Sequence, residues 1–203
     1  MSNIRTTGKK SSNTLVRDLV NVGIFAALYI VLAFLSSSIG YIPALIIFST
    51  GSIGLVTSIP LFLFFSKVER SILCCLIFCG IFGTAMLIMG QGILMFVISL
   101  LVGLLAGVCF KVIGKGFAGL FSANIVMTLM SSSMMLPLWT STEEYLAYTS
   151  TMCDAGYVAK LAELSSSYWP LIAIYAFGIL GAVVGGFVAR RVMKKHFERI
   201  GLA

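Results

Sequence analysis

Long runs of apolar residues alternate with short polar segments along most of the chain. Six of these runs approach or exceed the roughly 20 residues that a helix needs to cross the hydrocarbon core of a bilayer. They cover residues 19–35, 41–65, 71–89, 93–110, 117–138 and 170–189. Runs of this length predict helices rather than barrel strands, because a helix satisfies its backbone hydrogen bonds within one segment. The pattern therefore predicts an all-α integral membrane protein with six transmembrane helices.

The polar segments between the runs divide the chain into three parts. A polar tail covers residues 1–18, the six-helix membrane domain covers 19–189, and a basic tail covers 190–203. Most connections are short, but one long loop joins the fifth and sixth helices. This loop begins at Trp139 and ends at Trp169. It is predicted to be either a lid over a binding site or a solvated loop flanked by interfacial aromatic residues.

Composition supports the membrane assignment. Of the 203 residues, 59% are hydrophobic and 10% are charged, whereas ordinary soluble domains have about 25% charged residues. So few charges cannot cover the surface of a soluble domain, which excludes a soluble enzyme and a disordered chain. The net charge of +7 is not interpreted as nucleic-acid binding, because the basic residues are spread over the ends of the apolar runs.

The placement of charges predicts the orientation of the chain. With the N-terminus inside, every Lys and Arg except Lys160 falls in a cytoplasmic segment, while four of the seven acidic residues fall outside. Positive charge is enriched on the cytoplasmic side of membrane proteins. Both termini are therefore predicted to be cytoplasmic and the 139–169 loop external, with the lipid bilayer as a partner.

The apolar runs lack the residues of most catalytic or energy-coupling chemistry. None of the six contains Lys, Arg, Asp, Glu or His, and the chain has no Walker A motif. Its one histidine, His196, lies in the basic tail. We therefore predict that the chain is not an enzyme, has no catalytic residue or metal site and binds no cofactor itself. Any energy for transport would come from a partner, unless the chain is a passive facilitator.

Two groups of residues are candidates for contacts with other molecules. Gly23 and Ala27 are spaced four residues apart, which allows another helix to approach closely, either within the chain or from a partner. The second group comprises polar, aromatic and methionine residues near the external ends of the runs, which are candidates for a substrate pocket or for ordinary core packing. The substrate candidates are Tyr41, Met89, Gln91, Asn124, Met127, Met130, Met134, Trp139, Glu143, Tyr157 and Trp169.

The chain resembles the substrate-binding S components of energy-coupling factor (ECF) transporters. Within that group it is similar to the Trep_Strep family, also called MptD-like. The resemblance covers almost the whole chain. It is clearest in two segments, residues 18–27 (DLVNVGIFAA) and residues 194–201 (KKHFERIG). The number of predicted helices and the length near 200 residues also fit.

The resemblance implies a role in uptake and a location in a bacterial plasma membrane. S components capture a micronutrient from outside and deliver it by docking on a membrane coupling protein driven by two cytoplasmic ATPases, which use the ATP. It also implies that Gly23 and Ala27 form the docking face, and that the pocket opens under the loops after the first, third and fifth helices. We expect the ligand to be a small vitamin-like compound or a planar apolar one, and haem is one hypothesis. The alternative is a stand-alone passive facilitator or a structural membrane partner.

Overall fold

Six long helices form a bundle in the computed structural model, which describes the backbone of residues 3–42 and 45–199 and the side chains of residues 14–42 and 45–194. Six stretches along these helices are long and apolar enough to cross a membrane, the fifth of them running from Phe117 to Met135, so the prediction of six spanning helices is confirmed. The helices are α1 (Asn3–Ser37), α2 (Ile46–Lys67), α3 (Ser71–Ile88), α4 (Gly92–Ile113), α5 (Phe117–Ser132) and α9 (Trp169–Arg199).

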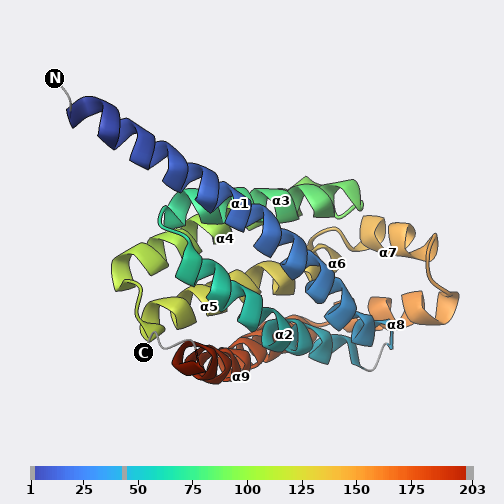
Figure 1. Cartoon of the computed structure of the whole chain (residues 1–203). Coiled ribbons are helices and arrows are strands. Elements are labelled where there is room, and N and C mark those ends of the chain that lie inside the picture. The colour runs from blue at the N-terminus through green and yellow to red at the C-terminus, as the bar shows by residue number, and fades with distance from the viewer. Residues whose placement is uncertain (1–2, 43–44, 200–203) are drawn as a thin grey trace.

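Short helices occupy the remaining segments. The segment predicted as a long loop folds mainly into helices. Two of them, α7 (Thr142–Ser150) and α8 (Ala155–Ser165), project from one end of the bundle (Figure 1). Asp154 is the N-cap of α8 and accepts a hydrogen bond from the backbone N–H of Tyr157 at 3.0 Å, which explains why a helix begins there. The short helices are η1 (Ser38–Tyr41), η3 (Ser133–Met135), α6 (Pro137–Thr140), α7 (Thr142–Ser150) and α8 (Ala155–Ser165).

The helix boundaries differ most from the predicted runs at four places. Helix α5 ends at Ser132 rather than at residue 138, because the chain continues as η3 and then as α6, which begins at Pro137. The second spanning helix begins at Ile46 rather than at Tyr41, because Tyr41 ends η1. Helix α1 extends back through the polar tail to Asn3, and α9 continues through the basic tail to Arg199. Hydrophobicity marks the membrane-embedded part of a helix. The Arg, Lys, Met and Glu residues of the basic tail have good helix propensity and continue α9. The tail before the first span is rich in Ser, Thr and Asn, so propensity does not explain why α1 begins so early.

Glycine and alanine set the closest helix contacts. Helix α2 packs most extensively against α9, and α3 against α4. A Cβ atom at Gly181 of α9 would lie 2.0 Å from the backbone oxygen of Gly51, and one at Gly107 of α4 would lie 2.6 Å from Ile72 Cα. These pairs of helices approach so closely because no side chain separates their backbones.

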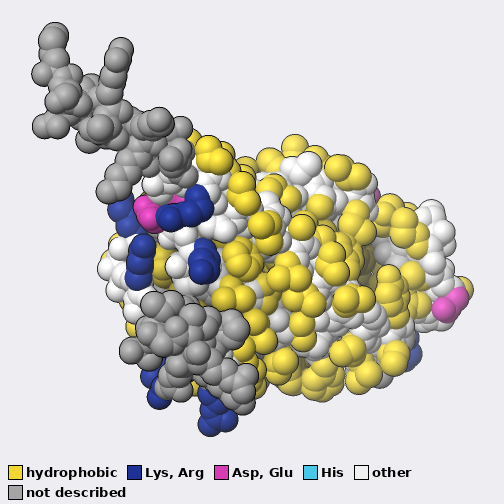
Figure 2. Space-filling view, viewed as in Figure 1, with side chains coloured by type: hydrophobic (Ala, Val, Ile, Leu, Met, Phe, Trp, Pro, Cys, Tyr) yellow, Lys and Arg dark blue, Asp and Glu magenta, His cyan; other side chains and the backbone are white. Residues whose placement is uncertain are grey.

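Charged side chains lie at the two ends of the bundle. Hydrophobic side chains cover the surface between them, and most Lys and Arg gather at one end (Figure 2). We call this the basic end; it contains the end of α9. The opposite end, where α7 and α8 lie, is called the cover end. The described basic-end cations are Arg17, Lys67, Arg70, Lys111, Lys115, Arg190, Arg191 and Lys194. The side chains of residues 1–13 and 195–203, including His196, lie outside those described.

A buried carboxylate attaches α1 to its neighbours at the basic end. Asp18 is fully buried, and its oxygens accept hydrogen bonds from the backbone N–H groups of Glu69 at 3.3 Å and Arg70 at 3.2 Å. The neighbouring Arg17 forms an ion pair with Glu69. These bonds satisfy free backbone donors just before α3, as a capping carboxylate does. The acidic residue at the start of the predicted first span therefore has a structural role.

Candidate ligand cavity and docking face

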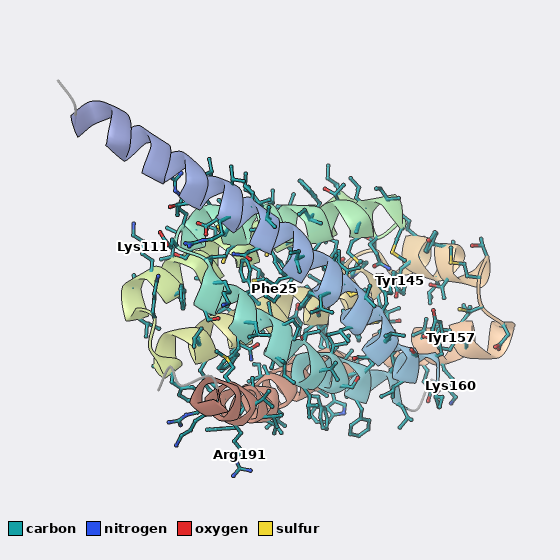
Figure 3. The ribbon with its side chains drawn as sticks, viewed as in Figure 1. Phe25, Lys111, Tyr145, Tyr157, Lys160 and Arg191 are labelled. Carbon is teal, nitrogen blue, oxygen red and sulfur yellow. The ribbon has the colours of Figure 1, made fainter. Side chains whose placement is uncertain are left out.

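A cavity of about 230 Å³ opens at the cover end. Its walls come from the ends of α1, α2, α3 and α5 together with η1 and η3, and α7 and the start of α8 form its cover. Figure 3 shows Tyr145 and Tyr157 at this end, opposite Lys111 and Arg191 at the basic end. The cavity is lined by Phe34, Ser37, Gly40, Tyr41, Ser49, Thr50, Ile53, Met86, Met89, Gln91, Ser131, Met134, Met135, Tyr145, Tyr148, Thr149, Met152, Cys153 and Tyr157.

The cover is attached by two tyrosine hydroxyls. Tyr148 of α7 donates a hydrogen bond to the backbone oxygen of Met89 at 2.6 Å. Tyr157 of α8 donates to the backbone oxygen of Gly40 at 3.2 Å. The Tyr148 ring fits against Gly90, where a Cβ atom would lie 2.8 Å from the ring and where φ is +83°. The turns after α1 and α3 therefore each hold one helix of the cover.

Apolar packing supports the base of the cover. Ile46 of α2, Leu138 of α6 and Leu161 of α8 are buried together, with Trp139 and Tyr145 packed around them. This cluster is separate from the main core between the long helices. The cover thus has its own small core, which joins it to the start of α2.

Most hydroxyl groups in the cavity wall are already hydrogen-bonded within the protein. Ser49 donates to the backbone oxygen of Ile46, and Thr50 donates to that of Ile174, both at 2.7 Å. Thr149 donates to the backbone oxygen of Tyr145 at 2.8 Å. Such bonds satisfy hydroxyl donors inside an apolar bundle, where an unmade hydrogen bond is costly.

One polar atom of the wall is different. Gln91, in the turn between α3 and α4, has a buried Oε1 without a hydrogen-bond partner in the part of the chain that the structure describes. The backbone N–H of the same residue is satisfied by the oxygen of Met86 at 3.0 Å. The amide oxygen of Gln91 is therefore an unfilled acceptor at the edge of the cavity.

The cover tyrosines are neutral hydrogen-bonding groups. Burial raises the pKa of Tyr145 to about 12, and burial also raises the pKa of Tyr157. Tyr145 makes a 3.8 Å contact through its hydroxyl with the sulfur of Met135, which is a weak acceptor. Both phenols stay protonated near neutral pH, so they add donors to the cavity without adding charge.

Five of the substrate candidates chosen from sequence line this cavity. They are Tyr41, Met89, Gln91, Met134 and Tyr157. The structure brings them together from η1, from the turn between α3 and α4, from η3 and from α8. Their role in binding stays a prediction.

The other six candidates lie elsewhere. Glu143 and Trp169 are exposed, and Trp139 packs in the base of the cover, donating its indole N–H to the backbone oxygen of Ser167 at 2.8 Å. Met127 and Met130 are buried in the main core. Asn124 is buried between α2, α5 and α9, and its amide donates to Ser58 Oγ at 2.9 Å and to the backbone oxygen of Ala182 at 3.0 Å.

Several cavity residues were not among the candidates. Tyr145 and Tyr148 carry the same signal as Tyr157, an aromatic residue in the long segment after the fifth span. Ser49 and Thr50 form a polar pair near the start of α2, and that pair was the available signal for this wall. Phe34 and Ile53 are ordinary apolar residues, and nothing in the sequence distinguishes them from core residues.

The small residues of α1 lie on an open surface. Gly23 and Ala27 are both exposed, and among the described residues nothing lies within 4 Å of a Cβ atom placed at Gly23. Exposed Val20, Ile24 and Val31 share this face. In the most apolar window of α1, 28% of the residues are buried, compared with 56% for α2. The bundle itself therefore leaves this small-residue face without a partner helix.

The described residues hold no group of three or more His, Cys, Asp or Glu that could bind a metal. Cys74, Cys75 and Cys79 are buried in α3, while Cys153 lies partly buried at the cavity. All five cysteines are free thiols.

Residues 16–199 match the model of one protein family, Trep_Strep, described as a hypothetical bacterial integral membrane protein. The match begins within α1 and includes the other five spanning helices and the cover. Searches of curated proteins and of solved structures gave no match. The chain belongs to the Trep_Strep family and is a multi-pass integral membrane protein.

Proposed function

We propose that this Trep_Strep protein is the substrate-capture (S) subunit of an ECF-type importer in the bacterial plasma membrane. The observation that carries the proposal is the cavity at the cover end, which is walled by four membrane helices and covered by α7 and α8. A largely pre-formed pocket of this kind is where small molecules bind in helical bundles.

The distribution of charge supports capture from outside. Cations gather at the end of the bundle opposite the cavity (Figure 2). In a membrane, the cation-rich end faces the cytoplasm, so the cavity faces the exterior. A ligand would enter beneath the cover and remain there until the protein meets a partner that opens a path inward.

The open face of α1 supports docking on a coupling protein. Helix pairs inside this bundle use glycine for close contact, yet Gly23 and Ala27 have no helix opposite them in the described structure. A partner helix could approach this face as closely as α9 approaches α2. The chain itself would catalyse no reaction and bind no cofactor, and two partner ATPases would supply the energy.

The dimensions of the cavity favour a compact ligand. Its volume of about 230 Å³ is below the roughly 300–1,000 Å³ of pockets that hold drug-sized molecules. Haem, the hypothesis considered from the sequence, is a four-ring compound with two carboxylates, so the small uncharged cavity does not favour it. A Soret shift on titration, lost on substitution of Met134, would support it. Absence of a shift at saturating haem would exclude it.

The docking face gives the sharpest test of the proposed function. Gly23→Leu and Ala27→Leu place large side chains on the open face without entering the cavity, so both variants should retain the ligand while uptake falls at least tenfold. Ala176→Leu is the matched control, since Ala176 is an exposed alanine of α9. It should leave uptake unchanged. Binding is measured by native mass spectrometry, and uptake in cells.

Co-purification decides between this function and a stand-alone role. The wild-type chain should purify with a membrane coupling protein and two ATPases, and Gly23→Leu should purify without them. Uptake that continues in cells lacking the ATPases would identify a passive facilitator instead. A chain that purifies alone and supports no uptake would indicate a structural membrane partner.

A further inference from the structure

The cavity has no charged group to offer a ligand. None of the described residues that line it is Lys, Arg, His, Asp or Glu. Moving an ion from water into such a site is costly unless an opposite charge or several hydrogen bonds compensate it. The wall offers a carboxylate or a phosphate neither an opposite charge nor several hydrogen bonds. Most of its serine and threonine hydroxyls already donate to backbone oxygens.

The shape-forming residues of the wall favour a flat ligand. Methionines project from three sides, with Met86 and Met89 near the end of α3, Met134 and Met135 in η3, and Met152 after α7. Tyrosines of the cover lie on the remaining side. Thioether sulfurs and phenol rings both make favourable contacts with aromatic rings. The wall therefore combines flexible soft groups with rigid rings, which suits a planar aromatic molecule.

Gln91 indicates where the polar group of that molecule would lie. Its Oε1 is buried and has no partner among the described residues, although it belongs to a residue that lines the cavity. Burying an acceptor without a donor is costly, so a ligand that supplies the donor gains affinity. The terminal torsion of a glutamine side chain is soft, so a bound ligand could draw the amide oxygen to its own donor by rotation about this bond.

We propose that the ligand is an uncharged, flat nitrogen heterocycle of one or two rings, whose N–H donates a hydrogen bond to Gln91 Oε1 while its faces contact methionine and tyrosine side chains. This assignment rests on the proposed capture function and adds the chemical class of the substrate. The assignment predicts that the cavity prefers neutral N–H heterocycles to ring compounds that are charged at neutral pH.

Three related probes test the assignment. Indole is neutral and carries one N–H, 1-methylindole lacks that donor, and indole-3-acetate adds a negative charge. Equilibrium dialysis against the purified full-length chain in detergent, stripped of retained ligand, gives a Kd for each. We expect indole to bind at least tenfold more tightly than either of the other two.

A substitution identifies the group responsible. Gln91→Leu removes the acceptor, so it should weaken indole binding about tenfold and leave 1-methylindole binding unchanged. Ile88→Leu is the control, because Ile88 is 82% exposed and does not line the cavity. The preference of the wild-type chain for indole over 1-methylindole is a test that needs no variant.

Three outcomes would overturn the assignment: equal binding of indole and 1-methylindole, tightest binding of indole-3-acetate, or binding of none of the three probes at millimolar concentration. Failure of the proposed function is detected separately. A chain that prefers indole but never purifies with a coupling protein and ATPases would leave the ligand class intact and refute the importer role. A chain that purifies with them but binds indole-3-acetate most tightly would support the importer role and refute the ligand class.

Discussion

At the scale of single residues, the methionines of α5 and of η3, which follows it, show what helical periodicity determines and what it leaves open. Met127, Met130 and Met134 share one face of a helix, as their spacing predicts. Only Met134 lines the cavity; Met127 and Met130 are fully buried in the core, with Met127 Sδ 3.6 Å from Cys79 Sγ. Periodicity gives the face of a helix, but the depth of a cavity along that face depends on the helices opposite.

Two amide side chains, Asn124 in a spanning helix and Gln91 in a turn, also differ in their position relative to the cavity. Asn124 is the main amide predicted within a spanning helix, and its sequence position gives no sign of its partners. In the structure it joins three helices through Ser58 and Ala182. Gln91, by contrast, lies in a short turn between two glycines with positive φ, and the conformation of that turn places it beside the cavity. Both amides keep a buried oxygen without a hydrogen-bond partner among the described residues, but only Gln91 lines the cavity.

The hydroxyls of Tyr148 and Tyr157 should control how often the cover opens. Replacing either tyrosine by phenylalanine removes one hydrogen bond to a backbone oxygen, which contributes about 0.5–1.5 kcal/mol. Amide hydrogen exchange across residues 142–165 should therefore quicken roughly two- to tenfold in each variant. The measurement is hydrogen–deuterium exchange with mass spectrometry on the purified protein in detergent.

Tyr168→Phe is the matched control for these two variants. Tyr168 is 70% exposed at the start of α9 and does not line the cavity, so its substitution should leave exchange in the cover unchanged. If Tyr148→Phe and Tyr157→Phe exchanged at the wild-type rate, the two hydroxyls would not be holding the cover closed.

At the scale of helices, glycine spacing alone did not distinguish internal from external interfaces. The sequence contains small residues four apart in α1, α4 and α9. The structure shows that Gly103 and Gly107 of α4 pack against α3, and that Gly181 and Gly185 of α9 pack against α2. The face with Gly23 is open. A motif that permits close approach does not specify which helix approaches, so the distinction required the packed bundle.

Alanine substitutions should distinguish the glycines that contact a neighbouring helix of the same chain from the glycine on the open face of α1. At Gly181 and Gly107 a methyl group would collide with backbone atoms of the neighbouring helix, and overpacking of this kind costs about 1–3 kcal/mol. Gly181→Ala and Gly107→Ala should therefore lower the midpoint of thermal unfolding by several degrees. Gly23→Ala has open space and should leave the midpoint unchanged or raise it slightly, because alanine is the better helix former.

Thermal unfolding of the three variants in one detergent, followed by circular dichroism, makes the comparison direct. An equal loss of stability in Gly23→Ala and Gly181→Ala would mean that a helix of the same chain covers the α1 face. That result would remove the structural basis for docking a partner there.

For the whole molecule, the apolar runs were sufficient to predict the number of membrane helices, because hydrophobic length is the main requirement for spanning a bilayer. They could not predict the cover. Residues 139–169 are too polar to span the membrane, and the helices within them depend on local capping by Asp154 and on packing around Leu161. The cavity likewise depends on contacts between segments that are distant in the sequence.

The orientation of the bundle in the membrane is predicted from the separation of charge between its two ends. Lysines and arginines gather at the basic end, whereas Glu143, Glu144 and Asp154 lie in the segment that forms the cover. The basic end should therefore face the cytoplasm. In a cysteine-free background, Thr151→Cys places a thiol at an exposed position of the cover, and Lys115→Cys places one at an exposed position of the basic end.

A membrane-impermeant maleimide added to intact cells should label Thr151→Cys at least tenfold more than Lys115→Cys. Permeabilised cells are the control, because both thiols should then react to a similar extent. The cover and the cavity would then face the exterior, as capture of a ligand requires. Stronger labelling of Lys115→Cys in intact cells would reverse the orientation, and a cavity facing the cytoplasm could not serve uptake from outside.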